Sequence, residues 1–471
     1  MKPIAQLSDL GHALAEASAA ASRDGQPHWI AVRSAVPTRD PLRLFEAGGA
    51  DRFFWERPAQ GVALAATGAA LSIETHGPRR FSDAARAARA CFSALHLCGD
   101  PAPPLAGPLL VGGFAFADAA QDSGLWSGFP ASRFVLPERM SARADGAAWR
   151  TLVQRVEPGA DAICLTDALL ARLEQDDARG GAAREWLDAR GDARGARTYR
   201  ATADRPPEAY SALVDAALSA LGAGDLEKVV VARCVRLDCE GGFGAAGLLD
   251  TLRASYPSCA TFAVGRGDAT FVGSTPERLL RLAGRHVETS ALAGSAPRGR
   301  SPEEDARLAL ELIESKKEQA EHAVVVRELR EALAPLCRGL RVPEAPELLR
   351  LEGIQHLETP LCGTLDGNAH VLDLAGSLHP TSAVAGAPRQ AALEWLERNE
   401  SLERGWYGGA IGFVEPSGGG ELAVALRSAL LRGATAHLFA GAGIVAGSQP
   451  QAELQETQLK LRALFTPLLE I

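Results

Sequence analysis

The chain has 471 residues, 46% of them hydrophobic, and a formal net charge of -9 at pH 7. This length is enough to bury a large core, as one big α/β domain or as two smaller ones, and the negative charge argues against a nucleic-acid partner. Eight cysteines are scattered without a CxxC pair, so neither a zinc site nor a disulfide framework is indicated. No apolar run is long enough to cross a membrane, and the first residues lack the apolar stretch of a secretion signal. We therefore expect a cytoplasmic protein without a membrane partner.

The N-terminal portion, residues 1–205, is predicted to be rich in sheet. Short strand-like runs occur at 29–36, 52–55, 62–74, 109–116 and 149–156. Residues 190–205 show no strand pattern and are expected to form a surface loop or linker. We place a boundary after this segment, so that residues 1–205 pack onto a second portion formed by residues 206–471.

The second portion begins with a predicted helix over 207–221, opened by two prolines and ended by glycines. A β-branched run follows at 228–236, typical of a buried strand, with Lys228 at its mouth. Residues 261–272 predict a hairpin that leads to Glu277 after a proline turn. If these two residues have structural roles only, Lys228 extends to solvent from the end of a strand and Glu277 caps the start of a helix.

Two pairs of glutamates occur with their members three residues apart: Glu318 and Glu321, and Glu453 and Glu456. The first pair follows Ser315, a natural N-cap, and shares a helical stripe with apolar side chains. Two helices could thus face four carboxylates toward one point, and oxygen ligands suit a hard cation such as Mg²⁺. Spacing by itself favours the structural alternative, a capping box at Ser315 and an ordinary i,i+4 pair between Glu456 and Lys460.

The last third of the chain is rich in glycine, notably at 405–413 and 438–445. A strand-like run between them ends at Arg427. The glycines could let the backbone approach a ligand, and they could equally mark strand bulges. No GK[ST] follows a glycine pair, which excludes a phosphate-binding P-loop.

Taken together and in order, these stretches resemble the chorismate-utilising enzymes, the family of isochorismate, salicylate, anthranilate and aminodeoxychorismate synthases. The resemblance covers roughly residues 206–466, and residues 112–116 carry a weaker match. Its motifs are KVVVAR, GSTPERLL, ALAGS, KEQAEH, QHL, LHPTSAVAG, GWYGGAIGF, ALRSAL, FAGAGIV and AELQETQLK. It implies an α/β (α+β) fold with two packed antiparallel β-sheets and helices on the outside.

The resemblance also implies a site for chorismate. It places Mg²⁺ on the ring carboxylate, held by Glu321 and Glu456 with Glu318 and Glu453 in the same cluster. It assigns Arg427 and Tyr407 to the carboxylate of the enolpyruvyl arm, a task that suits a guanidinium fork and a hydroxyl. The residues expected around the substrate are Ala293, Gly294, Ser295, His356, Ala383, Tyr407, Arg427, Gly443 and Lys460. For His356, a hydrogen-bonded core histidine is an alternative.

Isochorismate formation adds a water oxygen at C2 and expels the C4 hydroxyl, so it needs a base and an acid. The resemblance assigns these roles to Lys228 and Glu277. Anthranilate synthases usually carry Gln at the Lys228 position and use ammonia, so we expect no glutaminase subunit. Ala293 stands where some aminodeoxychorismate synthases have a nucleophilic lysine, which excludes that covalent intermediate.

The sequence therefore predicts an isochorismate synthase, an isomerase. The first alternative is a salicylate synthase, which goes on to eliminate pyruvate, and the second is a non-catalytic relative that only binds a partner. Salicylate synthases of the family tend to have a hydroxyl residue at the position of Ala383. The small apolar side chain favours an enzyme that stops at isochorismate.

Overall fold

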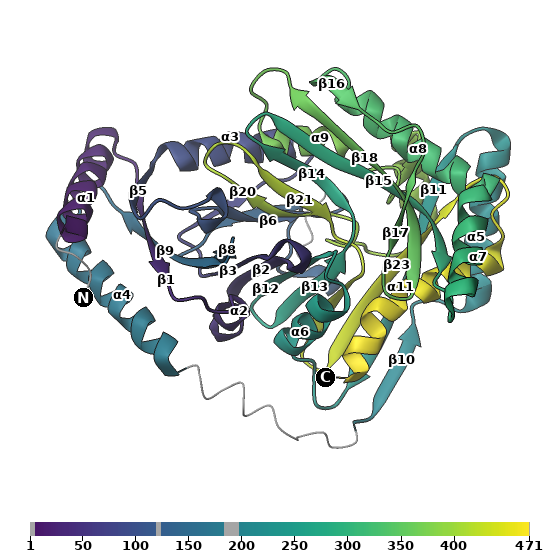
Figure 1. Ribbon diagram of the computed structural model, residues 1–471, viewed down its shortest axis with the longest axis horizontal. Coiled ribbons are helices and arrows are strands. Elements are labelled where there is room, and N and C mark those ends of the chain that lie inside the picture. Colours follow the sequence, from purple (N-terminus) through teal and green to yellow (C-terminus); the bar gives the residue numbers. More distant parts are fainter. Residues whose placement is uncertain (1–4, 119–123, 183–196, 471) are drawn as a thin grey trace.

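The computed structural model of the protein describes residues 5–118, 124–182 and 197–470. Within these ranges the strands form two sheets, one of 13 strands and one of 10. Their neighbouring strands pair antiparallel, except for β1 and β5, which are parallel. Helices lie outside the sheets (Figure 1). The predicted fold class is confirmed.

The larger sheet runs across the whole molecule. In order of pairing, its strands are β10 (Tyr199–Ala203), β11 (Lys228–Cys239), β23 (Thr435–Ile444), β22 (Ser428–Arg432), β13 (Ala269–Thr275), β12 (Ala260–Arg266), β2 (Asp51–Arg57), β3 (Val62–Thr67), β8 (Arg139–Ala144), β9 (Ala147–Val156), β1 (His28–Val36) and β5 (Leu95–Gly99), with β19 (Gly386–Ala387) paired to β11.

The smaller sheet packs against the larger one through an apolar core that includes an edge-to-face contact of Trp55 with Phe413. Its strands, in order, are β16 (Cys337–Arg341), β18 (Ile354–Leu365), β15 (His286–Pro297), β14 (Arg278–Ala283), β21 (Gly420–Val424), β20 (Ala410–Val414), β6 (Leu110–Phe114), β7 (Ser132–Leu136) and β4 (Leu71–Glu74), with β17 (Glu347–Arg350) paired to β18.

The helices cover the sheets on the outside, with α1 and α4 at one end of the molecule and α5, α7, α8 and α11 at the other (Figure 1). They are α1 (Ala5–Asp24), α2 (Leu42–Ala47), α3 (Arg80–Ser93), α4 (Ala162–Ala182), α5 (Pro207–Ala223), α6 (Ala245–Ser255), α7 (Pro302–Glu314), α8 (Lys316–Leu333), α9 (Val371–Leu378), α10 (Arg389–Asn399) and α11 (Pro450–Glu470). No helix in the described part of the chain is long and apolar enough to span a membrane.

The two portions of the sequence share both sheets. β2 pairs with β12 in the larger sheet, and β6 pairs with β20 in the smaller one. Backbone hydrogen bonds therefore join residues 1–205 to the rest of the chain.

Several predicted elements are confirmed, namely the helix α5, the buried strand β11 and the hairpin of β12 and β13. The predicted run 62–74 is two strands in different sheets, β3 and β4, because Gly68 between them turns the chain at a positive φ of 73°. The predicted linker 190–205 lies partly outside the described residues, and its end forms strand β10. This edge strand is mostly exposed, so its sequence lacks the hydrophobic alternation of a half-buried strand.

Candidate functional site

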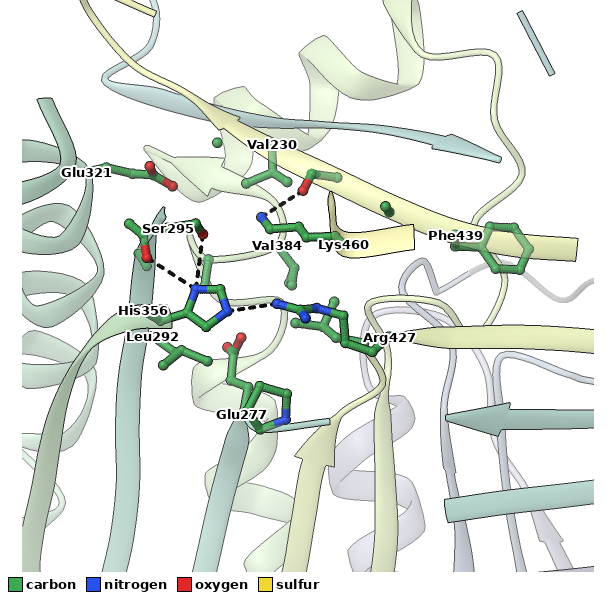
Figure 2. Close-up of a pocket in the computed structure, with 18 of the residues that line it drawn as sticks. Val230, Glu277, Leu292, Ser295, Glu321, His356, Val384, Arg427, Phe439 and Lys460 are labelled. Atoms are coloured by element: carbon green, nitrogen blue, oxygen red, sulfur yellow. Dashed lines mark hydrogen bonds between the residues drawn. The ribbon is translucent and has the colours of Figure 1, made fainter. Parts of the chain in front are cut away.

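One cleft has walls from both sheets and from α11, and its empty space, including the opening to solvent, is about 620 Å³. Figure 2 shows the side chains around it. Most of the site residues that the sequence analysis predicted are found in the walls of the cleft. They are Glu277, Ala293, Gly294, Ser295, Glu321, His356, Ala383, Tyr407, Arg427, Gly443 and Lys460. Three further predicted residues lie behind the residues that line the cleft and contact them: Lys228 contacts Glu321, Glu318 contacts Ser295, and Glu456 contacts Lys460.

Arg427 is held in a strained backbone conformation just after β21. Its φ is 47°, a region that costs a residue with a side chain about 1–3 kcal/mol. The side chain is buried and donates from Nη2 to Nε2 of His356 at 2.8 Å (Figure 2). Among the described residues Arg427 makes no ion pair, and burial lowers its pKa. A buried guanidinium without a carboxylate is suited to bind an anion.

His356 links Arg427 to the opposite wall of the cleft. Because Nε2 accepts from Arg427, the network assigns the ring proton to Nδ1, which lies 3.0 Å from Ser295 Oγ and 3.2 Å from the Gly294 carbonyl oxygen. Burial, and then the charge of Arg427, hold the pKa of His356 well below its usual value. The ring is therefore a neutral part of the cleft wall, not an isolated core histidine.

Tyr407 lies on the same side of the cleft as Phe439, and their rings stack at 5.3 Å with an angle of 19° between the planes. A Cβ atom added to Gly441 would stand 3.1 Å from the Tyr407 hydroxyl, so the glycine leaves room for that group. Burial raises the pKa of Tyr407, which keeps the hydroxyl protonated and able to donate.

Glu277 lies between β13 and β14 and is only 3% exposed. Burial raises the pKa of its carboxyl to about 7, against the opposing effect of Lys228 and Lys460. The sequence alternative of a helix start is wrong, because strand β14 follows directly and the Glu277 carbonyl accepts from Val424 N–H at 3.0 Å. The carboxyl is thus a proton donor near neutral pH.

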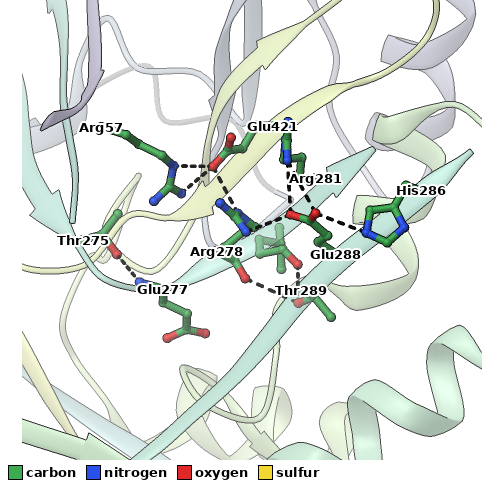
Figure 3. Close-up of polar contacts among 10 residues, drawn as sticks. Arg57, Thr275, Glu277, Arg278, Arg281, His286, Glu288, Thr289 and Glu421 are labelled. Carbon is green, nitrogen blue, oxygen red and sulfur yellow. Dashed lines mark hydrogen bonds and ion pairs between the residues drawn. The ribbon is translucent and has the colours of Figure 1, made fainter. Parts of the chain in front are cut away.

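An ion-pair network holds the strand that follows Glu277 (Figure 3). Arg278 contacts Glu421 at 3.2 Å and Glu288 at 3.0 Å, and Arg57 from the N-terminal portion donates to Glu421 at 2.6 Å. Figure 3 shows the Glu277 carboxyl directed away from these charges. The network fixes β14 without providing a partner that would ionise Glu277.

Lys228 begins β11 and is completely buried, so the alternative of a solvent-exposed lysine is wrong. Its Nζ lies 3.0 Å from Oε1 of Glu321. A Cβ atom at Gly443 would stand 2.0 Å from the same oxygen and 2.9 Å from Cε of Lys228. Only glycine at position 443 leaves space for this buried ion pair.

The predicted N-cap at Ser315 is confirmed, and its side chain accepts from Glu318 N–H at 3.4 Å. The Glu318 carboxylate does not complete a capping box. It accepts from Ser295 N–H at 3.0 Å and lies 3.0 Å from Lys317 Nζ. Burial and the charge of Glu321 raise the pKa of Glu318. The glutamate therefore faces the site, although its spacing also fits a cap.

The second glutamate pair lies on α11. Lys460 contacts Glu456 at 2.6 Å and donates to the Gly441 carbonyl at 2.9 Å, so the i,i+4 pair is present as well. Glu453 is 1% exposed and lies 2.8 Å from Lys317, which also contacts Glu318 on the other helix. Burial and the charge of Glu456 raise the pKa of Glu453 to about 6. Lys317 thus bridges the two glutamate pairs.

Comparison with known proteins decides the family. The family model described as "Chorismate binding enzyme" matches residues 13–469. The chain is 36% identical to the salicylate biosynthesis isochorismate synthase of Pseudomonas aeruginosa, over 98% of this chain and 96% of that protein. The chain belongs to the chorismate-binding enzyme family.

Two further relatives agree with this membership. Isochorismate synthase MenF of Bacillus subtilis is 31% identical, with 93% of each chain covered. The structure of MenF, the menaquinone-specific isochorismate synthase from Escherichia coli, superimposes with a TM-score of 0.74 at 26% identity, covering 98% of this chain and 99% of that one. The chorismate-binding fold therefore extends over residues 1–205 as well as over the region that carries the motifs.

The carboxylates of this chorismate-binding protein fit a hard cation by their chemistry. Among the described residues, no three His, Cys, Asp or Glu side chains converge as a ready-made metal site. The glutamates are instead paired with Lys228, Lys317 and Lys460. Two buried and two partly buried carboxylates, two of them with pKa values raised partly by a neighbouring glutamate, favour added positive charge. Binding one ion through all of them requires some of these lysine pairs to open.

Sequence reasoning missed two kinds of residue. Lys317 was not singled out, although a cation directly before the first glutamate was a usable signal. The apolar lining left no pattern of its own in the sequence, because its members come from separate strands and loops: Val230, Leu292, Val384, Leu426 and Phe439.

Proposed function

We propose that the protein is an isochorismate synthase, which converts chorismate to isochorismate by adding water at C2 and releasing the C4 hydroxyl. The observation that carries the proposal is a buried lysine, Lys228, directly behind the wall of a cleft that also holds the Glu277 carboxyl, whose pKa is raised to about 7. Lys228 begins β11 of the larger sheet, and Glu277 lies in the link from β13 of that sheet to β14 of the smaller one. Isochorismate formation needs an acid and a base on different sides of the ring. The relatives that match over nearly their whole length are named isochorismate synthases.

In this mechanism Lys228 removes a proton from the attacking water, and Glu277 donates a proton to the departing hydroxyl. The pKa of about 7 keeps a large fraction of Glu277 protonated at neutral pH. Lys228 has to give its own proton up first. Its Nζ is buried away from solvent and lies 3.0 Å from Oε1 of Glu321.

Arg427 and Tyr407 bind the carboxylate of the enolpyruvyl arm. Arg427 supports this role because it is buried and donates a hydrogen bond to a neutral histidine, His356. An incoming carboxylate would therefore complete an ion pair with the guanidinium. Tyr407 supplies a protonated hydroxyl beside it. The substrate is thereby oriented with its arm at this end of the cleft.

At the other end, Glu321 and Glu456 would hold Mg²⁺, with Glu318 and Glu453 in the same cluster. When bound, the ion supplies the positive charge that holds the ring carboxylate of chorismate. Lys460 balances the remaining negative charge through Glu456. We expect no glutaminase subunit, because the attacking group is water, and we predict a cytoplasmic location.

The direct test is to incubate the purified protein with chorismate and Mg²⁺ and to separate the products by chromatography. We expect isochorismate to appear, and EDTA to stop its formation. Ammonium salts should yield no anthranilate. Anthranilate as the main product, or no turnover of chorismate under any of these conditions, would overturn the proposal.

We also infer that the reaction stops at isochorismate instead of continuing to salicylate. Ala383 lines the cleft with a methyl group, which offers no hydrogen bond to hold the enolpyruvyl arm over the C2 hydrogen. The measurement is salicylate fluorescence during chorismate turnover at neutral pH. Salicylate formed without an added lyase, at a rate close to that of chorismate loss, would reverse the assignment.

A further inference from the structure

Strand β11 carries Lys228, but within the described part of the chain a stretch of its outer edge has no partner strand. β19 pairs with Lys228 and Val229, and β10 pairs only from Val235 onward. The backbone groups between these two pairings need other partners, since an unpaired buried amide or carbonyl is costly. This open stretch includes Val230, which lines the cleft.

A buried ion pair between Glu400 and Arg404 occupies that edge. The two side chains are 3% and 4% exposed and make a bidentate contact of 2.5 and 2.8 Å. Glu400 accepts from Ala232 N–H at 2.8 Å, and Arg404 donates to the Val230 carbonyl at 2.7 Å. The pair therefore supplies partners for two backbone groups of the open stretch, while Val230 N–H donates to the Ala385 carbonyl at 2.9 Å.

Arg404 also holds a second wall of the cleft. Its Nη1 donates to the Val384 carbonyl at 2.7 Å, and Val384 and Ala383 both line the cleft. Figure 2 shows the side chains of Val230 and Val384 on this part of the cleft wall. The Arg404 carbonyl accepts from Tyr407 N–H at 2.9 Å. One residue thus fixes the strand of Lys228, the segment of Ala383 and the turn of Tyr407.

We propose that Arg404 and Glu400 are positioning residues, which hold the strand of the base and the wall around Ala383 at the separation that isochorismate formation needs. The proposal rests on the function proposed above. The planar guanidinium fork matters here, because a lysine cannot make these four donations in fixed directions. Neither Arg404 nor Glu400 lines the cleft, so the pair acts through the backbone it holds.

The test compares Arg404→Lys with a matched control, Arg266→Lys. Arg266 is also a buried arginine in an ion pair, with Asp51, and neither residue lines the cleft. We expect Arg404→Lys to lower kcat/KM about 10- to 100-fold, mainly through kcat, because small displacements of reacting groups are costly. Arg266→Lys should keep kcat and KM per folded molecule, although both variants lose thermal stability.

A second measurement does not depend on turnover. Hydrogen–deuterium exchange should become faster in residues 228–234 and 381–387 of Arg404→Lys, and not in those of Arg266→Lys. Glu400→Gln keeps an acceptor for Ala232 N–H but loses the charge. It should therefore show a smaller fall in kcat/KM and a smaller increase in exchange than Arg404→Lys.

Unchanged exchange in both segments, or activity that falls only in proportion to the unfolded fraction, would overturn the positioning role. A wild-type protein that makes no isochorismate would refute the proposed function alone, since the exchange result still decides whether Arg404 fixes the two walls.

Discussion

At one end of the cleft three lysines are paired with four carboxylates, whereas at the other end Arg427 has a neutral histidine as its described neighbour. At the first end three ammonium groups already contact the four carboxylates and leave one negative charge in excess, so a metal ion there would have to compete with these ammonium groups. The second end has an uncompensated positive charge that a substrate carboxylate can neutralise at once. Under the function proposed above, the end with Arg427 is ready to bind the substrate arm, whereas the carboxylate end would have to reorganise to hold a metal.

The largest effect is expected at the carboxylate end. Glu321→Gln or Glu456→Gln should each abolish turnover, because each removes a charged oxygen ligand while leaving the fold intact. The measurement is isochorismate formation across a Mg²⁺ titration. Glu331→Gln, on an exposed position of the same helix α8 as Glu321, is the matched control and should retain activity. Activity that survives EDTA would remove the metal from the mechanism.

Lys228→Gln should slow turnover by about 10²-fold or more, since glutamine can hydrogen-bond but cannot accept the proton of water. The variant also leaves Glu321 without its 3.0 Å partner, so circular dichroism should first confirm that the protein is folded. A near-normal kcat in the folded variant would show that another group activates the water.

The substitution Arg427→Lys tests the end of the cleft where Arg427 and His356 lie. We expect kcat/KM to fall by about 10- to 100-fold, mostly through KM, because lysine keeps the charge but loses the fork that binds a carboxylate. Arg236→Lys, on an exposed position of β11, should change neither constant. A loss confined to kcat would mean that Arg427 acts on the transition state instead of binding the arm.

The effect expected for Glu277 is on stability and pH dependence. Its pKa of about 7 lies above the value of 4.5 in the unfolded chain, so its contribution to stability is fully present below pH 4.5 and is lost as pH rises to about 7. The wild type should therefore lose about 3 kcal/mol of unfolding free energy relative to Glu277→Gln across this window. Urea titrations at pH 4.5 and pH 7.5 measure the difference.

The same group predicts a pH profile for the wild type. Because the acid must be protonated, kcat/KM should decline as pH rises through about 7. A profile that keeps rising above pH 8 would argue against Glu277 as the proton donor.

Local features of the site were predictable from sequence, because short-range rules decide them. Ser315 caps α8, and the β-branched run after Lys228 forms a buried strand, as predicted. Glu277 was ambiguous because a proline turn precedes strands as well as helices, and here β14 follows. The family motifs identified the residues that line the cleft.

Pairings across long stretches of sequence were not predictable. The contact of Lys228 with Glu321 joins a strand to a helix more than 90 residues later, and no local pattern encodes it. The same holds for Lys317, whose partner Glu453 lies on α11. The boundary at residue 205 followed from composition, whereas the pairing of β2 with β12 depends on the register of two distant strands.

The position of α11 in the chain has a consequence for synthesis on the ribosome. Lys228, Glu277 and Glu321 are made early, but the strand β23 and the helix α11 with Glu453 and Glu456 come after residue 434. Until then, β11 lacks its central neighbour, and the first two glutamates have no opposing pair. A nascent chain therefore lacks the carboxylates of α11 that the proposed mechanism needs, and the unfinished edge of β11 would expose unpaired backbone groups on which a chaperone could act.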